Sequence, residues 1–191
     1  MHFFLAYLMD ILMADLVDST WHIAQSEPEK RLTSFELELW RIFHGFLRWQ
    51  EDCERCFNNY ELSGGDISVL HVIRVRNNPK TIYDVARILN REDMYNMQYS
   101  MRKLERLGLI EKVAKKNKKM TVYTVTEKGQ TDTDVFATAR RNILVDLFKK
   151  ETGLKMEEVT EVLMKLKVLY DEAGQIAVSY KGLGSEVIKN K

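Results

Sequence analysis

The sequence predicts a mainly α fold with a small β-wing of two to three strands. Only 2 prolines and 9 glycines interrupt the 191 residues, so long helices are expected. Apolar side chains recur at helical spacing through most of the chain, and the alternation typical of strands replaces this spacing only between residues 109 and 126. The chain is long enough to bury a real core. We therefore expect a helical core that carries a short hairpin, with further helices around it.

Positive charge is concentrated in the middle of the sequence. The formal net charge is only +1. Residues 87–128, however, hold 11 basic and 5 acidic side chains, a net charge of +6, whereas residues 1–65 hold 5 basic and 11 acidic side chains, a net charge of −6. A local excess of this kind indicates a polyanionic partner better than the total charge does.

Residues 1–32 are expected to form an N-terminal helical extension. The first part, MHFFLAYLMDILMADLV, is apolar, but it has no basic n-region, and Asp10 and Asp15 interrupt it before about 18 apolar residues accumulate. A signal peptide and a membrane-spanning helix are therefore not expected. The acidic residues fall on one side, which favours a helix buried against other helices in an oligomer; a helix on a membrane surface is the alternative.

The two cysteines, Cys53 and Cys56, are too few for a disulfide framework, which indicates a cytoplasmic protein. No second cysteine pair exists and the 4 histidines are scattered, so we expect two small buried side chains and no metal site. A redox role for the thiols is the alternative. The sequence shows no glycine-rich phosphate loop, nucleophile elbow or paired carboxylates with a histidine, so neither an enzyme nor a cofactor is expected.

Capping residues mark the expected helix starts. Thr33 and Glu36 form a capping box at the start of a long helix that runs to about Tyr60. Ser63 begins a shorter helix that ends near Asn77-Asn78-Pro79. Thr81 begins the next helix, and Asp93 caps the helix after it. Only Asn90-Arg91-Glu92 separates these two helices, as in a helix-turn-helix. The apolar face of the helix from Asp93 is Met94, Met97, Met101, Leu104 and Leu107.

The period changes after Gly108. Residues 109–115 and 120–126 read as two strands, and the polar sequence Lys116-Asn117-Lys118-Lys119 lies between them as a hairpin tip. Two more helices are expected at about 131–150 and 155–172, and the tail after Gly174 carries weak signals. A helix-turn-helix followed by a basic hairpin is the order of a winged helix-turn-helix, in which one helix enters the major groove of DNA and the hairpin follows the backbone or the minor groove.

The motifs of this region resemble those of MarR-family transcriptional regulators. LSGGDISVL (62–70) resembles their L-T-x-x-E/Q-x-x-V-L helix start, and TIYDVARILN (81–90) resembles their T-x-x-E-L-A-x-x-L segment. DMYNMQYSMRKLERLGLIEK (93–112) resembles their D-x-x-T-V-S-R-x-V-x-x-L-E-x-x-G-L-I-x-R recognition helix and first wing strand, and TVTEKG (124–129) resembles the L-T-x-x-G that ends the wing. The resemblance implies a winged helix-turn-helix DNA-binding domain at 62–129 and a helical dimerisation region at 33–61 and 130–191.

Two departures from the family pattern concern the DNA contacts. The family's Thr-Val-Ser-Arg corresponds to Asn96-Met97-Gln98-Tyr99, and its wing Asp followed by Arg-Arg corresponds to the lysine-rich tip. Asn and Gln can pair with adenine edges, and Tyr can contact a thymine methyl or a phosphate, so we expect duplex binding with a different operator. The expected DNA-binding residues are Tyr95, Asn96, Gln98 and Tyr99 near the bases, Arg102 and Lys103 on phosphate, and Lys116, Asn117, Lys118 and Lys119 in the wing.

The resemblance implies a transcriptional regulator, more often a repressor, that binds a pseudo-palindromic duplex as a homodimer and responds to a small ligand, typically an aromatic acid. Each observation also has a plainer interpretation. The helix from Asp93 could pack in the core with a solvated polar face, and the lysines could form a solvated hairpin tip. The alternative function is a winged-helix protein-interaction module that no longer reads DNA.

Overall fold

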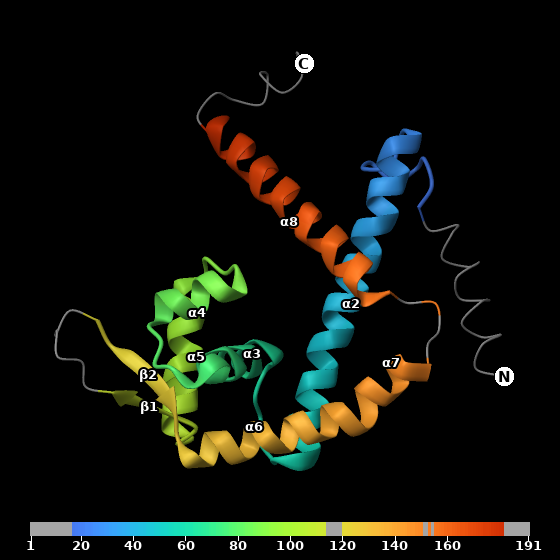
Figure 1. Ribbon diagram of the computed structural model, residues 1–191. Coiled ribbons are helices and arrows are strands. Elements are labelled where there is room, and N and C mark those ends of the chain that lie inside the picture. The colour runs from blue at the N-terminus through green and yellow to red at the C-terminus, as the bar shows by residue number, and fades with distance from the viewer. Residues whose placement is uncertain (1–16, 114–119, 151–152, 154, 182–191) are drawn as a thin grey trace. The chain divides into compact units, whose positions relative to one another are not determined.

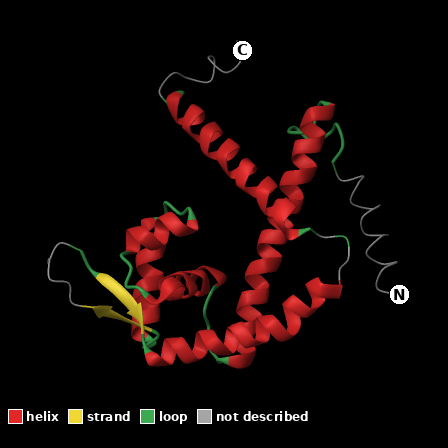
Figure 2. Ribbon diagram, viewed as in Figure 1, coloured by secondary structure: helices red, strands yellow, loops and turns green. Residues whose placement is uncertain are grey.

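The computed structural model describes residues 17–113, 120–150, 153 and 155–181, so the predicted N-terminal apolar helix lies outside the described residues. The chain divides into two compact units, Met1–Ala139 and Arg140–Lys191. Figures 1 and 2 show their helices and strands. The first unit contains the helices α2 (Glu27–Phe57), α3 (Gly64–Arg74), η1 (Val75–Asn77), α4 (Ile82–Leu89), α5 (Met94–Arg106) and α6 (Glu127–Ala139), and the strands β1 (Ile110–Val113) and β2 (Val122–Val125). Among the described residues, no helix is long and apolar enough to span a membrane.

Helix α2 begins earlier than predicted. Its cap is Ser26, whose backbone N–H donates to the Glu29 carboxylate at 2.7 Å. The predicted start at Thr33 is wrong, because the Thr33 hydroxyl instead donates to the backbone carbonyl of Ile23 at 2.6 Å. Pro28 lies in the first turn of α2, where a missing N–H costs no hydrogen bond. The helix ends at Phe57, close to the predicted end.

The next two predicted helix starts are confirmed. The Ser63 hydroxyl accepts a hydrogen bond from the Asp66 N–H at 3.2 Å, and the Thr81 hydroxyl accepts one from the Asp84 N–H at 3.1 Å. Asp93 stands at the cap position of α5, but its side chain makes no capping hydrogen bond. The prediction that Asp93 caps this helix is therefore wrong in mechanism.

The wing is a two-stranded antiparallel sheet with Ile110 opposite Val125 and Val113 opposite Val122. Strand β2 is shorter than the predicted 120–126, and β1 begins one residue after the predicted 109. The end of the predicted first strand and the tip fall within 114–119, outside the described residues. In place of a third strand there is one bridge, in which the N–H of Lys80 donates to the carbonyl of Tyr123 at 2.9 Å and the Tyr123 N–H donates back at 2.8 Å. This bridge joins the segment before α4 to β2.

The core of the first unit lies where α3, α5 and the sheet meet (Figure 1). Met97, Met101 and Leu104 are at most 2% exposed, which confirms that the methionine face of α5 is internal. Helix α6 begins at Glu127, a turn before the predicted start, and approaches the sheet closely. A Cβ added at Gly129 would lie 2.1 Å from the Leu109 carbonyl oxygen, so only glycine fits there.

The second unit contains η2 (Arg140–Val145), α7 (Asp146–Lys150) and α8 (Met156–Ser179). The helix predicted at 131–150 is thus observed as α6, the π-helical turn η2 and α7 in succession. Helix α8 runs through Gly174 to Ser179, beyond the predicted end near residue 172. A single glycine costs a helix about 1 kcal/mol, which the remaining turns of α8 can absorb.

Candidate nucleic-acid interface

Helix α5 presents an aromatic and polar face to solvent. Tyr95 is 78% exposed and Tyr99 is 57% exposed, and Asn96, Gln98 and Arg102 are also exposed. The opposite face is the buried methionine face described above. Side chains one helical turn apart share a face, so the core interaction of α5 leaves a continuous outer stripe free for another molecule.

An ion pair stands at the N-terminus of α5. The Arg91 Nε and Nη2 atoms lie 2.8 and 2.5 Å from the two carboxylate oxygens of Asp93. The hydrogen bonds from Arg91 hold the pKa of Asp93 at about 2. The Asn96 side-chain amide donates to the same carboxylate at 3.2 Å, which orients this amide at the start of the helix. The outer face of α5 therefore begins with a fixed negative charge that Arg91 partly neutralises.

Lys103 forms an ion pair with a buried carboxylate. Its ammonium lies 2.8 Å from Asp66, whose side chain is only 3% exposed. Burial alone would raise the pKa of Asp66, but hydrogen bonds from Lys103, Ser100 and Ser63 hold this pKa below its usual value. The pair connects α5 to the first turn of α3. In this position Lys103 orients α5, and the predicted contact of Lys103 with a phosphate, which stays a prediction, would have to compete with this ion pair.

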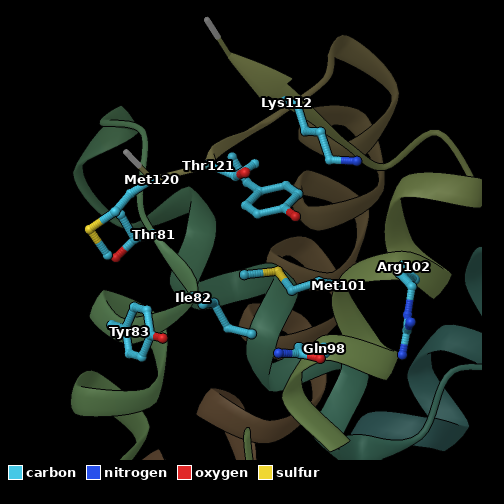
Figure 3. Close-up of a pocket in the computed structure, with 10 residues that line it drawn as sticks. Thr81, Ile82, Tyr83, Gln98, Met101, Arg102, Lys112, Met120 and Thr121 are labelled. Carbon is cyan, nitrogen blue, oxygen red and sulfur yellow. The ribbon is translucent and has the colours of Figure 1, made fainter. Parts of the chain in front are cut away.

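Arg102, the other predicted phosphate contact, is exposed and makes no hydrogen bond or ion pair within the part of the chain that the structure describes. It borders a cleft of about 500 Å³ between the start of α4, the outer side of α5 and the sheet (Figure 3). Gln98, Lys112 and Thr121 also line this cleft. Gln98 and Arg102 are one helical turn apart, so they share the side of α5 that faces the wing.

The predicted wing contacts Lys116, Asn117, Lys118 and Lys119 lie outside the described residues, so they stay predictions. The described part of the wing holds one lysine in β1, Lys112, which forms an ion pair with Glu105 of α5 at 2.9 Å. The ion pair connects the sheet to the C-terminal half of α5. The wing and the exposed face of α5 are thereby held on one side of the unit.

Lys80 supports this arrangement, although its position in the sequence does not predict such a role. The side chain is buried, and its ammonium donates to the carbonyl oxygens of Ile73 and Asn78 at 3.0 Å and to the side-chain oxygen of Asn78 at 2.9 Å; it also donates to the carbonyl of Val75. Burial lowers its pKa. The ammonium donates hydrogen bonds to carbonyl oxygens at and after the C-terminus of α3, while the backbone of Lys80 pairs with β2. The sequence gives no signal for this role, because a lysine after Asn78-Pro79 reads as an exposed loop residue.

The two cysteines differ from the prediction that both are buried. Cys53 is 3% exposed, and burial raises the pKa of its thiol to about 11. Cys56 is exposed, so that part of the prediction is wrong: it lies three residues further on, on the outer side of α2. A raised thiol pKa disfavours the reactive thiolate at Cys53. The described residues hold no group of histidine, cysteine and acidic side chains that could bind a metal ion.

Comparisons with known proteins agree with this geometry. Residues 62–129 match a family model described as a winged helix DNA-binding domain. This segment is a winged-helix domain. No match was found among curated proteins.

Solved structures share the fold of the winged-helix domain and of helices around it. FabT from Streptococcus pneumoniae, in complex with DNA, is 20% identical over 76% of this chain and 99% of its own, with a TM-score of 0.56. The transcriptional regulator BldR from Sulfolobus solfataricus is 19% identical over 75% and 98%, with a TM-score of 0.59. MarR from Staphylococcus aureus, in complex with salicylate and kanamycin, is 15% identical over 75% and 92%, with a TM-score of 0.55. The resemblance to MarR-family regulators is confirmed as a likeness of fold.

Proposed function

We propose that this chain is a MarR-type transcriptional regulator that binds double-stranded DNA through its winged-helix domain. The observation that carries the proposal is α5, which buries its methionine face and exposes Tyr95, Asn96, Gln98 and Tyr99 beside the wing. A B-form major groove admits one helix with this arrangement, and amide and tyrosine side chains can contact base edges. Arg102 and the tip residues 116–119 supply phosphate contacts.

The protein acts as a homodimer in this proposal. Helix α2 exposes large apolar side chains, with Trp40 at 61% and Ile42 at 70% exposed, and α8 exposes Val168 and Leu169 at 61% and 59%. Apolar surface on this scale favours a protein partner. The proposed arrangement assigns 62–129 to DNA, 33–61 and 130–191 to dimerisation, and 1–32 to a helical extension of the dimer. Two copies would recognise a pseudo-palindromic site with half-sites about one helical turn apart.

The direction of regulation is also part of the proposal. We propose repression by operator occupancy, relieved by a small aromatic acid that binds between the dimerisation helices and the winged-helix domain. FabT is known in complex with DNA and the Staphylococcus aureus MarR in complex with salicylate, which supports both halves of this idea for a chain of the same fold.

A mobility-shift titration with generic duplex at low salt tests the DNA proposal. We expect binding that weakens by about 10³–10⁵ between 50 and 200 mM salt if the dimer neutralises about 6–10 phosphates. Lys118→Glu combined with Lys119→Glu should weaken binding strongly. The matched control is Lys149→Glu combined with Lys150→Glu, which makes the same change in charge on α7 and should have a much smaller effect.

The competing function is a winged-helix module that binds a protein through the same tyrosine-rich face. It predicts no duplex binding below tens of micromolar at low salt and no difference between the two lysine double variants. That pair of results would refute the DNA proposal. Sedimentation of Ile42→Glu tests the dimer separately: a charge at this exposed apolar position should shift the protein toward the monomer and weaken DNA binding with it.

A further inference from the structure

The cleft between α4, α5 and the wing has a lining that suits one kind of ligand. Tyr83 and Thr121 contribute hydroxyls, Gln98 an amide and Arg102 a guanidinium, and Ile82 and Met120 contribute apolar surface (Figure 3). Among the residues that the structure describes, two cations line the cleft, Arg102 and Lys112, and none of the lining residues is a carboxylate. A ligand that is anionic at one point and apolar beside it matches this surface.

The two cations differ in availability. Lys112 already pairs with Glu105 at 2.9 Å. Other basic side chains near α5 are also engaged: Arg91 with Asp93 and Lys103 with Asp66. Arg102 makes no such interaction among the described residues and is exposed. A free guanidinium at the edge of a cleft without carboxylates is a strong site for a single phosphate, because it can donate two parallel hydrogen bonds.

The geometry of a DNA duplex indicates which part of the DNA would lie in this cleft. If α5 lies in the major groove and the hairpin reaches the adjacent minor groove, the strand that separates the two grooves must pass between α5 and the hairpin. The cleft occupies that position, since α5 contributes Gln98 and Arg102 to one side and the sheet contributes Lys112 and Tyr123 to another.

We propose that this cleft binds one sugar-phosphate unit of that strand in each half-site, with Arg102 and Gln98 as ligands of the phosphodiester. The inference rests on the proposed DNA-binding function and refines it. The non-bridging phosphate oxygens accept hydrogen bonds from Arg102 and from the amide of Gln98, and the hydroxyls of Tyr83 and Thr121 lie on the same lining. Ile82 and Met120 supply the apolar surface against which the deoxyribose rests.

One consequence is that the exposed side chains of α5 have two different roles. Gln98 contacts the backbone and not the bases, because it shares the wing side of the helix with Arg102. Tyr95, Asn96 and Tyr99 are left to choose the bases. Contacts to phosphate position a protein on DNA without selecting sequence, so Gln98 and Asn96 should differ in what their loss does.

The test uses the full chain and a duplex that it selects from a random pool. Each phosphate of this duplex is replaced in turn by an uncharged methylphosphonate, and the affinity is measured for the wild type, Arg102→Ala and Arg106→Ala. We expect the wild type to lose about tenfold in affinity at one linkage per half-site. Arg102→Ala should lose about as much on the unmodified duplex and nothing further at that linkage. Arg106→Ala, an exposed cation of α5 outside the cleft, should keep the full loss there.

Gln98→Ala should weaken binding to the selected duplex and to random duplex by the same factor, whereas Asn96→Ala should reduce the preference for the selected one. The proposal is overturned if Arg102→Ala and a neutral linkage reduce the affinity independently at every position, so that their fold losses multiply everywhere. It is also overturned if Gln98→Ala reduces the sequence preference. Either result leaves DNA binding itself intact. Absence of any duplex binding by the wild type at low salt would instead refute the proposed function.

Free phosphate shares the chemistry of the backbone, so sodium phosphate is titrated against the complex with the ionic strength held constant by chloride. We expect no weakening beyond that caused by chloride, because the cleft is shaped for a strand with an apolar sugar beside each charge. Specific competition by phosphate at low concentration, lost in Arg102→Ala, would assign the cleft to a free anion and overturn the backbone proposal.

Discussion

Helices α5 and α8 both carry an apolar stripe, but α5 buries its stripe within the first unit, whereas α8 leaves its stripe exposed within the second. Met97 and Leu104 of α5 are fully buried, whereas no residue of α8 is buried and Val168 and Leu169 are more than half exposed. The amphipathic signal in the sequence is similar in kind. The difference lies in what packs on each helix: α5 packs on α3 and the sheet, while the apolar side chains of α8 stay exposed within its unit.

Helix α2 shows both situations along its length. Its C-terminal part buries Gln50, Cys53 and Glu54 against the winged-helix domain. Its middle part exposes Trp40 and Ile42. A Cβ at Gly64 would lie 2.6 Å from the Leu47 side chain, which shows how closely α3 approaches α2 between the exposed and the buried parts of α2. The core of the winged-helix domain therefore ends part of the way along α2.

The largest predicted effect tests this difference directly. Leu104→Ala removes a fully buried side chain and should lower the free energy of unfolding by about 2–5 kcal/mol. Leu169→Ala, the matched change on α8, should leave the unfolding of the winged-helix domain nearly unchanged and weaken self-association. Urea unfolding followed at several protein concentrations separates the two, since only the effect of Leu169→Ala should depend on concentration. Equal, concentration-independent losses would show that α8 is part of the same core.

An intermediate effect is expected at the ion pair that orients α5. Lys103→Met leaves the buried carboxylate of Asp66 with its serine donors alone and should cost about 1–3 kcal/mol at neutral pH. The pKa of Asp66 is lowered in the folded protein, so its contribution is present above the unfolded pKa of about 4 and is lost as the pH falls through the folded value. Lys103→Met should therefore raise the pH at which acid unfolding begins.

The measurement for this pair is a series of urea unfolding curves between acid and neutral pH. The stability difference between the wild type and Lys103→Met should shrink as the pH falls and Asp66 becomes protonated. The conservative control is Lys103→Arg, which keeps the charge. A difference that stays constant with pH would mean that Lys103 contributes through packing of its methylene groups and not through Asp66.

Local sequence signals predicted most of the helices of the winged-helix domain, because helix caps and the helical spacing of apolar residues depend on residues that are close in sequence. Ser63 and Thr81 cap as expected, and the methionine face of α5 is internal as expected. The start of α2 was missed because a long helix can begin at any suitable cap, and Ser26 precedes Thr33.

Side-chain partners that are distant in sequence could not be predicted. Lys103 and Arg102 are adjacent and look equivalent, yet only Lys103 meets a buried carboxylate, 37 positions away. Lys80 is likewise held by an environment that only the fold creates. Tertiary packing thus decides which cations remain exposed and unpaired among the described residues, while local sequence decides where the helices lie.

The smallest predicted effect on stability concerns Asp93, and it should run opposite to the effect on binding. The ion pair between Arg91 and Asp93 is partly exposed, at 24% and 42%, so Asp93→Asn should change stability by less than about 1 kcal/mol. The same change removes a negative charge from the start of the proposed reading helix and frees Arg91 for phosphate. DNA affinity should rise by about fivefold at low salt, and the gain should fade as salt is added. Asp134→Asn is the matched control, since Asp134 pairs with Arg74 at 2.7 Å in a similar surface ion pair on α6. If both variants raised the affinity equally, the cause would be net charge alone, whereas a gain confined to Asp93→Asn would locate the DNA at the N-terminal end of α5.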